Sequence, residues 1–187
     1  RAAFDVDFPM VLLGERMFDS GHDHVTMHNV EAARAATGHL ISQGRRRIAV
    51  VGAHVGEQVG SAVLRTQGYL KALEDAGIAP DPALIGEAGL WHRADGAEAM
   101  HRLLDSGTPI DAVFGLNDAL ALGAMHALHV RRVSVPDEVA VIGFDDIDEA
   151  RYASPPMSSV SPGREEIATT AVQLLQARIA ARGEGWT

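Results

Sequence analysis

The strongest constraint on the fold is an alternation, along the whole chain, of short apolar runs with longer stretches of helical periodicity. The helical stretches place apolar side chains three and four residues apart, whereas the short runs are almost continuously apolar, as buried parallel strands are. This strand–helix alternation predicts an α/β fold built on a parallel, doubly wound sheet. The predicted strands are 10–14, 47–52, 84–89, 111–116 and 139–144, with a weaker extended segment at 24–29, and the predicted helices are 30–44, 61–77, 94–107, 117–130 and 164–183.

The end of the chain carries two more specific expectations. Residues 155–162 contain Pro155, Pro156 and Pro162 and are expected to form an extended connector. The apolar residues of the helix that follows recur at helical spacing, so we expect them to face inward. They are Ile167, Val172, Leu175 and Ile179.

The composition excludes several classes of protein. With 187 residues, of which 47% are hydrophobic, the chain is a globular protein of one or two domains. It has no cysteine, which removes disulfides, thiolate metal sites and a cysteine nucleophile and suits a reducing compartment such as the cytoplasm. A formal net charge of −9 makes this chain by itself a poor binder of nucleic acid. No apolar run approaches the roughly 18 residues that a membrane helix needs.

Polar and aromatic side chains follow several of the predicted strands. Ligands of doubly wound sheets bind beyond the carboxyl ends of the strands, so these side chains form the candidate site. The residues are Arg65, Trp91, Asn117 and Asp145, with Asp146 beside the last of them. A guanidinium donor, an indole ring, an amide and carboxylate acceptors suit a polyol with apolar faces and hydroxyl edges. This edge has no histidine–serine pair and no lysine, so we expect binding rather than catalysis.

Each of these residues also has a structural interpretation. Asp145 can cap the helix after its strand, and Asn117 can cap the helix at 117–130. Arg65 can be a surface charge on its helix. We interpret Asp118 as a structural N-terminal cap rather than a ligand contact.

Two other motifs could indicate a metal or nucleotide site. His22, His24 and His28 would share one face of a strand, but no acid or cysteine completes a metal site there, so no metal is expected. The glycine-rich stretch GAHVGEQVG at 52–60 matches neither the dinucleotide nor the P-loop pattern, so no cofactor is expected.

Several stretches, in order along nearly the whole chain, resemble the effector-binding core of the LacI/GalR family of transcriptional regulators. The most specific is VPDEVAVIGFDD at 135–146, which follows NDALALGAMHAL at 117–128 and precedes PPMSSV at 155–160. The stretches NVEAARAATGHLISQGRRRIAVVG at 29–52 and RTQGYLKALEDAGI at 65–78 also match.

The resemblance implies a type I periplasmic-binding-protein-like fold of two subdomains, one nearly complete here and one partial, with the ligand in the cleft between them. It implies that residues 1–25 end the N-terminal subdomain, that 26–155 form most of the C-terminal subdomain and that 156–187 return to the N-terminal one. Because the chain begins at Arg1 without an initiator methionine, we interpret it as part of a longer protein.

The resemblance also implies roles for the candidate residues. By motif position, Arg65, Asn117 and Asp145 fall on the family's effector-contacting positions, and Trp91 matches an aromatic often found in the pocket.

The function that the resemblance implies is the effector-sensing core of a DNA-binding repressor, not an enzyme. A small polar molecule, expected to be a sugar, would control it, and a helix-turn-helix domain absent from this chain would bind operator DNA. We expect a homodimer, with ALALGAMHAL at 119–128 as a candidate for the apolar dimer face. The alternative is a periplasmic or extracellular sugar-binding protein of a transporter, which shares the fold.

Overall fold

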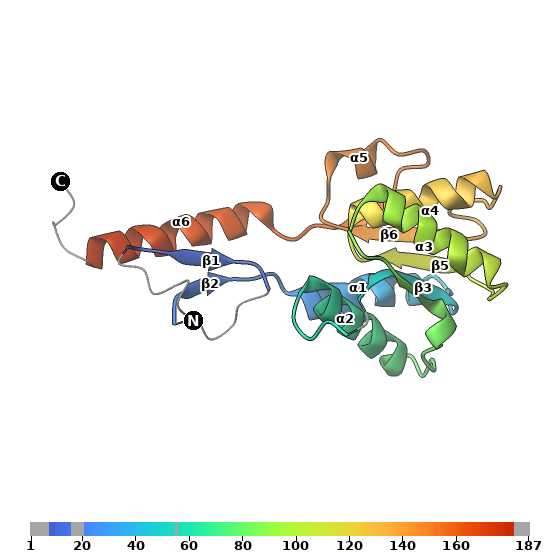
Figure 1. Ribbon diagram of the computed structural model, residues 1–187, viewed down its shortest axis with the longest axis horizontal. Coiled ribbons are helices and arrows are strands. Elements are labelled where there is room, and N and C mark those ends of the chain that lie inside the picture. The colour runs from blue at the N-terminus through green and yellow to red at the C-terminus, as the bar shows by residue number, and fades with distance from the viewer. Residues whose placement is uncertain (1–7, 16–20, 55, 182–187) are drawn as a thin grey trace. The chain divides into compact units, whose positions relative to one another are not determined.

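Five parallel strands in the order β4-β3-β5-β6-β7 form the main sheet of the computed structural model, which describes residues 8–15, 21–54 and 56–181 (Figure 1). The first four strands correspond to predicted apolar runs, and β3, β5 and β6 are buried along their whole length. The strands are β3 (Ile48–Ala53), β4 (Ile85–Glu87), β5 (Ala112–Gly115), β6 (Ala140–Phe144) and β7 (Ser158–Val160). The predicted parallel, doubly wound α/β sheet is therefore confirmed.

Helices connect the strands and cover both faces of this sheet. The connection from β3 to β4 runs in the opposite direction along the sheet from the connections β4 to β5 and β5 to β6. Because such crossovers are right-handed, α2 lies on one face and α3 and α4 lie on the other (Figure 1). The helices are α1 (Asn29–Ser42), α2 (Ser61–Asp75), α3 (Arg93–Asp105), α4 (Asp118–Val130) and the short α5 (Asp148–Arg151), with a 3-10 turn, η2, at Pro82–Leu84.

A glycine allows α1 and α2 to approach each other closely. A Cβ atom on Gly68 of α2 would lie 2.3 Å from the carbonyl oxygen of Val30 and 2.7 Å from Cβ of Ala33, both in α1. No side chain fits at that distance, so glycine is required there. The close approach places the start of α2, which carries Arg65, beside the start of α1.

Helix α4 was a candidate for an exposed dimer face, and this prediction is wrong. Its apolar residues are buried against α3 and β6 within the chain itself. They include Leu120, Ala121, Ala124, Met125, Ala127 and Leu128. The apolar residues that made this helix a candidate for the interface therefore belong to the hydrophobic core. His126 and His129 are exposed on the outer side of the helix.

The segment after β6 contains regular structure that the sequence did not predict. Residues 155–162 were expected to be a connector, but Ser158–Val160 pair in parallel with β6, with Ser159 opposite Gly143. The strand is only three residues long and lies between prolines, so no apolar alternation announces it. Its position at the sheet edge brings the side chain of Ser159 to the loop after β6.

The chain divides into two compact units. Unit 2 comprises His28–Gln58 and Ala62–Pro162 and contains the five-stranded sheet. Unit 1 comprises Arg1–Met27, Val59–Ser61 and Gly163–Thr187.

Within unit 1, β1 (Val11–Leu13) and β2 (Asp23–Val25) form a parallel pair, and α6 (Arg164–Ala181) contacts both strands. Arg178 of α6 forms a bidentate ion pair with Asp23, with Nε–Oδ2 and Nη2–Oδ1 distances of 2.6 and 2.9 Å.

The inward face predicted for the last helix is largely wrong. No residue of α6 is buried, and the side chains of Val172 and Ile179 are 54% and 52% exposed. Ile167 and Leu175 are half-buried. Two three-residue strands, the described packing partners of α6, offer too little surface to cover an 18-residue helix. The described part of the chain contains no helix that could span a membrane.

Candidate functional site

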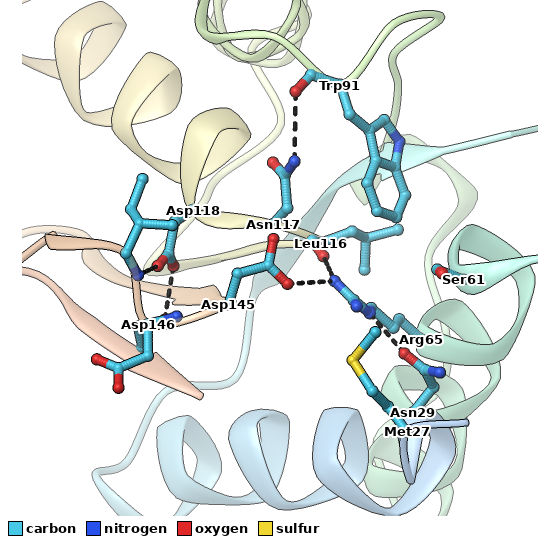
Figure 2. A network of polar contacts seen from close by, with 12 residues as sticks. Met27, Asn29, Ser61, Arg65, Trp91, Leu116, Asn117, Asp118, Asp145 and Asp146 are labelled. Atoms are coloured by element: carbon cyan, nitrogen blue, oxygen red, sulfur yellow. Dashed lines mark hydrogen bonds and ion pairs between the residues drawn. The ribbon is translucent and has the colours of Figure 1, made fainter. Parts of the chain in front are cut away.

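The carboxyl ends of β3 and β5 lie where the sheet reverses its winding. The chain leaves β3 toward one edge of the sheet and leaves β5 toward the other, so the loops after these neighbouring strands diverge. Ligands of doubly wound sheets bind at this switch point. The structure brings all four predicted site residues to this end of unit 2, namely Arg65, Trp91, Asn117 and Asp145 (Figure 2).

Arg65 is buried at the centre of the group. Its residue exposure is 2%, which excludes the interpretation as a surface charge. Nε donates to Oδ1 of Asn29 at 2.8 Å, and Nη1 donates to the carbonyl oxygen of Leu116 at 2.5 Å. The guanidinium carbon lies 3.6 Å from the ring centroid of Phe144, so a cation–π contact also holds the guanidinium in place. Arg65 is thus fixed by three parts of the fold: α1, the residue directly after β5, and β6.

Asp145 faces this arginine. Its Oδ1 lies 3.4 Å from Nη1 of Arg65, and its side chain is 37% exposed, whereas that of Arg65 is 3% exposed. The carboxylate is therefore the solvent-accessible member of the pair. A fixed cation beside an accessible carboxylate keeps that carboxylate oriented as an acceptor.

Trp91 borders the group on the side of β4. Its Nε1 donates to the carbonyl oxygen of Gly52 at 3.0 Å, and its ring centroid is 5.6 Å from the guanidinium carbon of Arg65. The ring of His54 meets it edge to face at 6.0 Å, and Nδ1 of His54 bonds Oε2 of Glu57 at 2.9 Å. The indole is thereby held in place with a half-buried ring.

Asn117 serves the fold at this position. Its Oδ1 accepts from the backbone N–H of Leu120 at 2.8 Å, which confirms the interpretation as the N-cap of α4. Its Nδ2 donates to the carbonyl oxygen of Trp91 at 3.3 Å. Asn117 therefore links the start of α4 to the loop that carries the indole.

Asp118 has a structural position, but it does not cap its own helix as predicted. It is fully buried, and its Oδ2 accepts from the backbone N–H of Ile147 at 2.9 Å. Its Oδ1 accepts from the hydroxyl of Ser159 at 2.6 Å. Burial raises the pKa of this carboxyl above its ordinary value, although the two hydrogen bonds favour the ionised form and oppose the shift.

Several participants were not predicted from the sequence. Asn29 and Phe144 hold Arg65, Ser159 bonds Asp118, and His54 packs on Trp91. Phe144 and Ser159 belong to stretches whose apolar or extended character was recognised, but their contacts depend on which strand lies beside which. Asn29 became a partner only through the close approach of α1 and α2.

A metal centre at the three N-terminal histidines finds no support. In the residues that the structure describes, no group of three His, Cys, Asp or Glu side chains is arranged to hold a metal ion. His24 bonds the carbonyl oxygen of Gly14, and His28 is an exposed residue at the start of α1.

Comparison with known proteins identifies the family. Residues 37–185 match the family described as periplasmic binding protein-like domain. The HTH-type transcriptional repressor PurR of Histophilus somni is 34% identical over 183 residues, which cover 98% of this chain and 54% of that protein. The HTH-type transcriptional repressor CytR of Escherichia coli is 35% identical over 167 residues, covering 89% of this chain and 48% of that protein. The chain thus spans about half the length of these curated relatives.

A solved structure of the LacI family from Sanguibacter keddieii superimposes with a TM-score of 0.89 at 49% identity, covering 98% of this chain and 67% of that one. Both the sequence likeness and the structural likeness extend over nearly the whole chain. The type I periplasmic-binding-protein-like fold implied by the sequence motifs is therefore confirmed. The chain belongs to the LacI/GalR family of regulators, of which it forms the periplasmic-binding-protein-like core.

Proposed function

We propose that this chain is the effector-sensing core of a DNA-binding transcriptional repressor and that its effector is a small polar molecule, a sugar or sugar derivative. The observation that carries the proposal is the pair formed by Arg65 and Asp145 at the switch point of the sheet. A buried arginine there orients a carboxylate whose side chain remains 37% exposed. Such a carboxylate is built to accept hydrogen bonds from outside the chain.

The chemistry of the neighbouring side chains supports a sugar. Asp145 accepts from hydroxyl groups, Arg65 contributes positive charge, and the half-buried ring of Trp91 offers an apolar surface to the face of a sugar ring. Asn117 contributes its amide, in exchange for its present contact with Trp91. We assign these four residues to ligand binding. Neighbours in structure include a regulator solved with cellobiose, 35% identical, and one solved with bound ribose, 26% identical.

The remaining elements of the proposal concern the whole protein. The matched relatives are named HTH-type transcriptional repressors, so operator DNA would be bound by a helix-turn-helix domain outside this chain, in a cytoplasmic homodimer. Effector binding would shift the population between two arrangements of the subdomains and so change the geometry of the DNA-binding domains. The relatives favour neither a transporter's binding protein nor an enzyme.

We further propose the division into subdomains that the motifs implied. Residues 26–155 would form most of the C-terminal subdomain, with 1–25 and 156–187 belonging to the N-terminal one.

A thermal-shift screen of the full-length protein tests the proposed ligand class. D-ribose, cellobiose, D-glucose and D-galactose would be compared with a set of amino acids of similar size. A ligand that binds only the folded state at a hundred times its Kd raises the free energy of unfolding by about 2.7 kcal/mol, which is a clear rise in Tm. At least one sugar should produce this rise. A response to amino acids with none to any sugar would contradict the proposed class.

A further inference from the structure

Two adjacent residues after β6 have unusual backbone angles. Asp145 has a φ of 113° and Asp146 a φ of 51°, and neither is a glycine. Side chains with a Cβ disfavour this left-handed region, so such residues persist only where the surrounding structure holds them. Backbone strain of this kind is concentrated at functional sites, and here it occurs at the residue whose carboxylate faces Arg65.

Three successive backbone N–H groups after β6 donate hydrogen bonds to acceptors in β7 and α4. The N–H of Asp145 donates to the carbonyl oxygen of Val160, and that of Asp146 to Oγ of Ser159, each at 2.9 Å. The N–H of Ile147 donates to Oδ2 of Asp118, also at 2.9 Å. Two of the three acceptors are thus side chains rather than backbone.

The two side-chain acceptors are themselves connected. The hydroxyl of Ser159 donates to Oδ1 of Asp118 at 2.6 Å, so Asp118 and Ser159 form one unit that bonds both N–H groups. The side chains of Asp145 and Asp146 point in different directions in Figure 2, the first toward Arg65 and the second away from it. This division follows from the turn of the backbone between them.

A glycine in β6 leaves space for the side chain of Asp118. A Cβ atom on Gly143 would lie 2.0 Å from Oδ1 of Asp118, so only glycine permits the carboxylate to lie over β6. Asp118 is fully buried, and burying a carboxylate is unfavourable unless its hydrogen bonds compensate. An acid kept in this position, with a glycine beneath it, indicates a role beyond filling the core.

We propose that Asp118 and Ser159 are positioning residues, which hold residues 145–147 in the strained conformation that directs the Asp145 carboxylate toward Arg65 and the ligand. The inference rests on the proposed function for the identity of the ligand, but the backbone geometry can be tested without one. Without the pair, the N–H groups of residues 146 and 147 lose their acceptors and the backbone relaxes toward negative φ. The carboxylate of Asp145 then turns away from Arg65.

The test compares three serine variants of the full-length protein. Ser159→Ala removes the hydroxyl, Ser159→Thr retains it, and Ser158→Ala makes the same deletion on the neighbouring, exposed residue of β7. Crystal structures report φ of residues 145 and 146 and the distance from Arg65 to Asp145. Only Ser159→Ala should bring either φ to a negative value and lengthen that distance. Asp118→Asn, in which an amide replaces one acceptor oxygen, provides the same comparison if Ser159→Ala does not fold.

Calorimetric titration with D-ribose and cellobiose gives the second readout. Ser159→Ala should weaken binding of the responding sugar about tenfold, because a hydrogen bond to a charged group is worth about a decade or more in an equilibrium constant. Ser159→Thr should restore the affinity, and Ser158→Ala should leave it unchanged. A lower Tm with unchanged φ values and unchanged affinity would show that the pair only stabilises the fold, and would overturn the proposal.

Different results contradict the sugar-sensing function and the positioning role of Asp118 and Ser159. If the wild-type protein binds neither these sugars nor any in the wider panel, the sugar-sensing function is wrong. The φ values of Ser159→Ala then still decide whether the pair holds the backbone. If the wild type binds a sugar and Ser159→Ala binds it equally well, only the positioning role is wrong.

Discussion

Nη1 of Arg65 lies 3.4 Å from Oδ1 of Asp145, although 80 residues separate them in the sequence. The arginine is anchored by Asn29 and Leu116, whereas the carboxylate remains accessible to solvent. The pair therefore acts as a fixed cation that orients an exposed acceptor.

Arg65→Lys should lower the free energy of unfolding by about 1–3 kcal/mol, because buried acceptors that lose their donor cost that much. Lysine lacks the planar fork that reaches both Asn29 and Leu116. Urea unfolding of the full-length protein measures the change. Arg34→Lys is the matched control, since Arg34 pairs with Asp75 on the surface, with side chains 55% and 49% exposed, and such pairs contribute about 0–1 kcal/mol. Equal effects of the two substitutions would contradict the anchoring role of Arg65.

Gly143→Ala should destabilise the protein by about 1–3 kcal/mol, the usual cost of overpacking, because its new Cβ would lie 2.0 Å from Oδ1 of Asp118. Gly38→Ala provides the contrast. Gly38 lies inside α1, and no heavy atom lies within 4 Å of the place that an added methyl group would take, so alanine there should stabilise by about 0.5–1 kcal/mol. Urea unfolding should show a lowered free energy of unfolding for Gly143→Ala and a raised one for Gly38→Ala. If Gly143→Ala leaves the free energy of unfolding unchanged, Asp118 does not lie over β6.

Much of the fold followed from the sequence because its signals are local. Short, almost continuously apolar runs predicted β3 and β6, and helical spacing predicted α1 to α4. The rule that ligands bind beyond the carboxyl ends of strands correctly gathered Arg65 and Asp145 at one edge. Predictions failed where the burial of a residue depended on which segments pack against it. The same apolar spacing is buried in α4 and largely exposed in α6, and only the packing partners distinguish the two.

Asp118 gives the clearest case of information that the sequence lacks. Its position at the start of a helix indicated a cap, but Asn117 caps that helix, and Asp118 bonds a loop and a strand that come later in the chain. The contact depends on β7, a three-residue strand with too few side chains to show a period. Long-range hydrogen bonds of this kind leave no local pattern.

The stability of the protein should depend on the ionisation of Asp118. Burial raises the pKa of this carboxyl in the folded state, so the folded protein binds its proton more tightly than the unfolded chain. The resulting stabilisation is fully present below the unfolded pKa, about 3.9, and is lost as the pH rises through the folded pKa. Subtracting the free energy of unfolding of Asp118→Asn isolates this contribution from those of other acids. The difference between wild type and variant should fall with rising pH, and a constant or rising difference would contradict a raised pKa.

Residues 1–187 expressed alone should not bind duplex DNA specifically. Their net charge of −9 opposes association with phosphates, and the proposed function assigns DNA binding to another domain. An electrophoretic mobility shift assay with an operator that the full-length protein recognises makes the comparison. A sequence-specific shift by residues 1–187 would show that the core itself reads DNA.

The most direct measurement is a calorimetric titration of Asp145→Ala in the full-length protein with the sugar that the thermal-shift screen identifies. Removing the acceptor leaves ligand hydroxyls unpaired at a cost of roughly 1.5–3 kcal/mol, so Kd should rise about ten- to a hundredfold. Asp148→Ala, which removes an exposed acid from the adjacent α5, should leave Kd unchanged. A wild-type Kd in Asp145→Ala, accompanied by a lowered Tm, would show that Asp145 serves only the fold and would contradict the binding site described here.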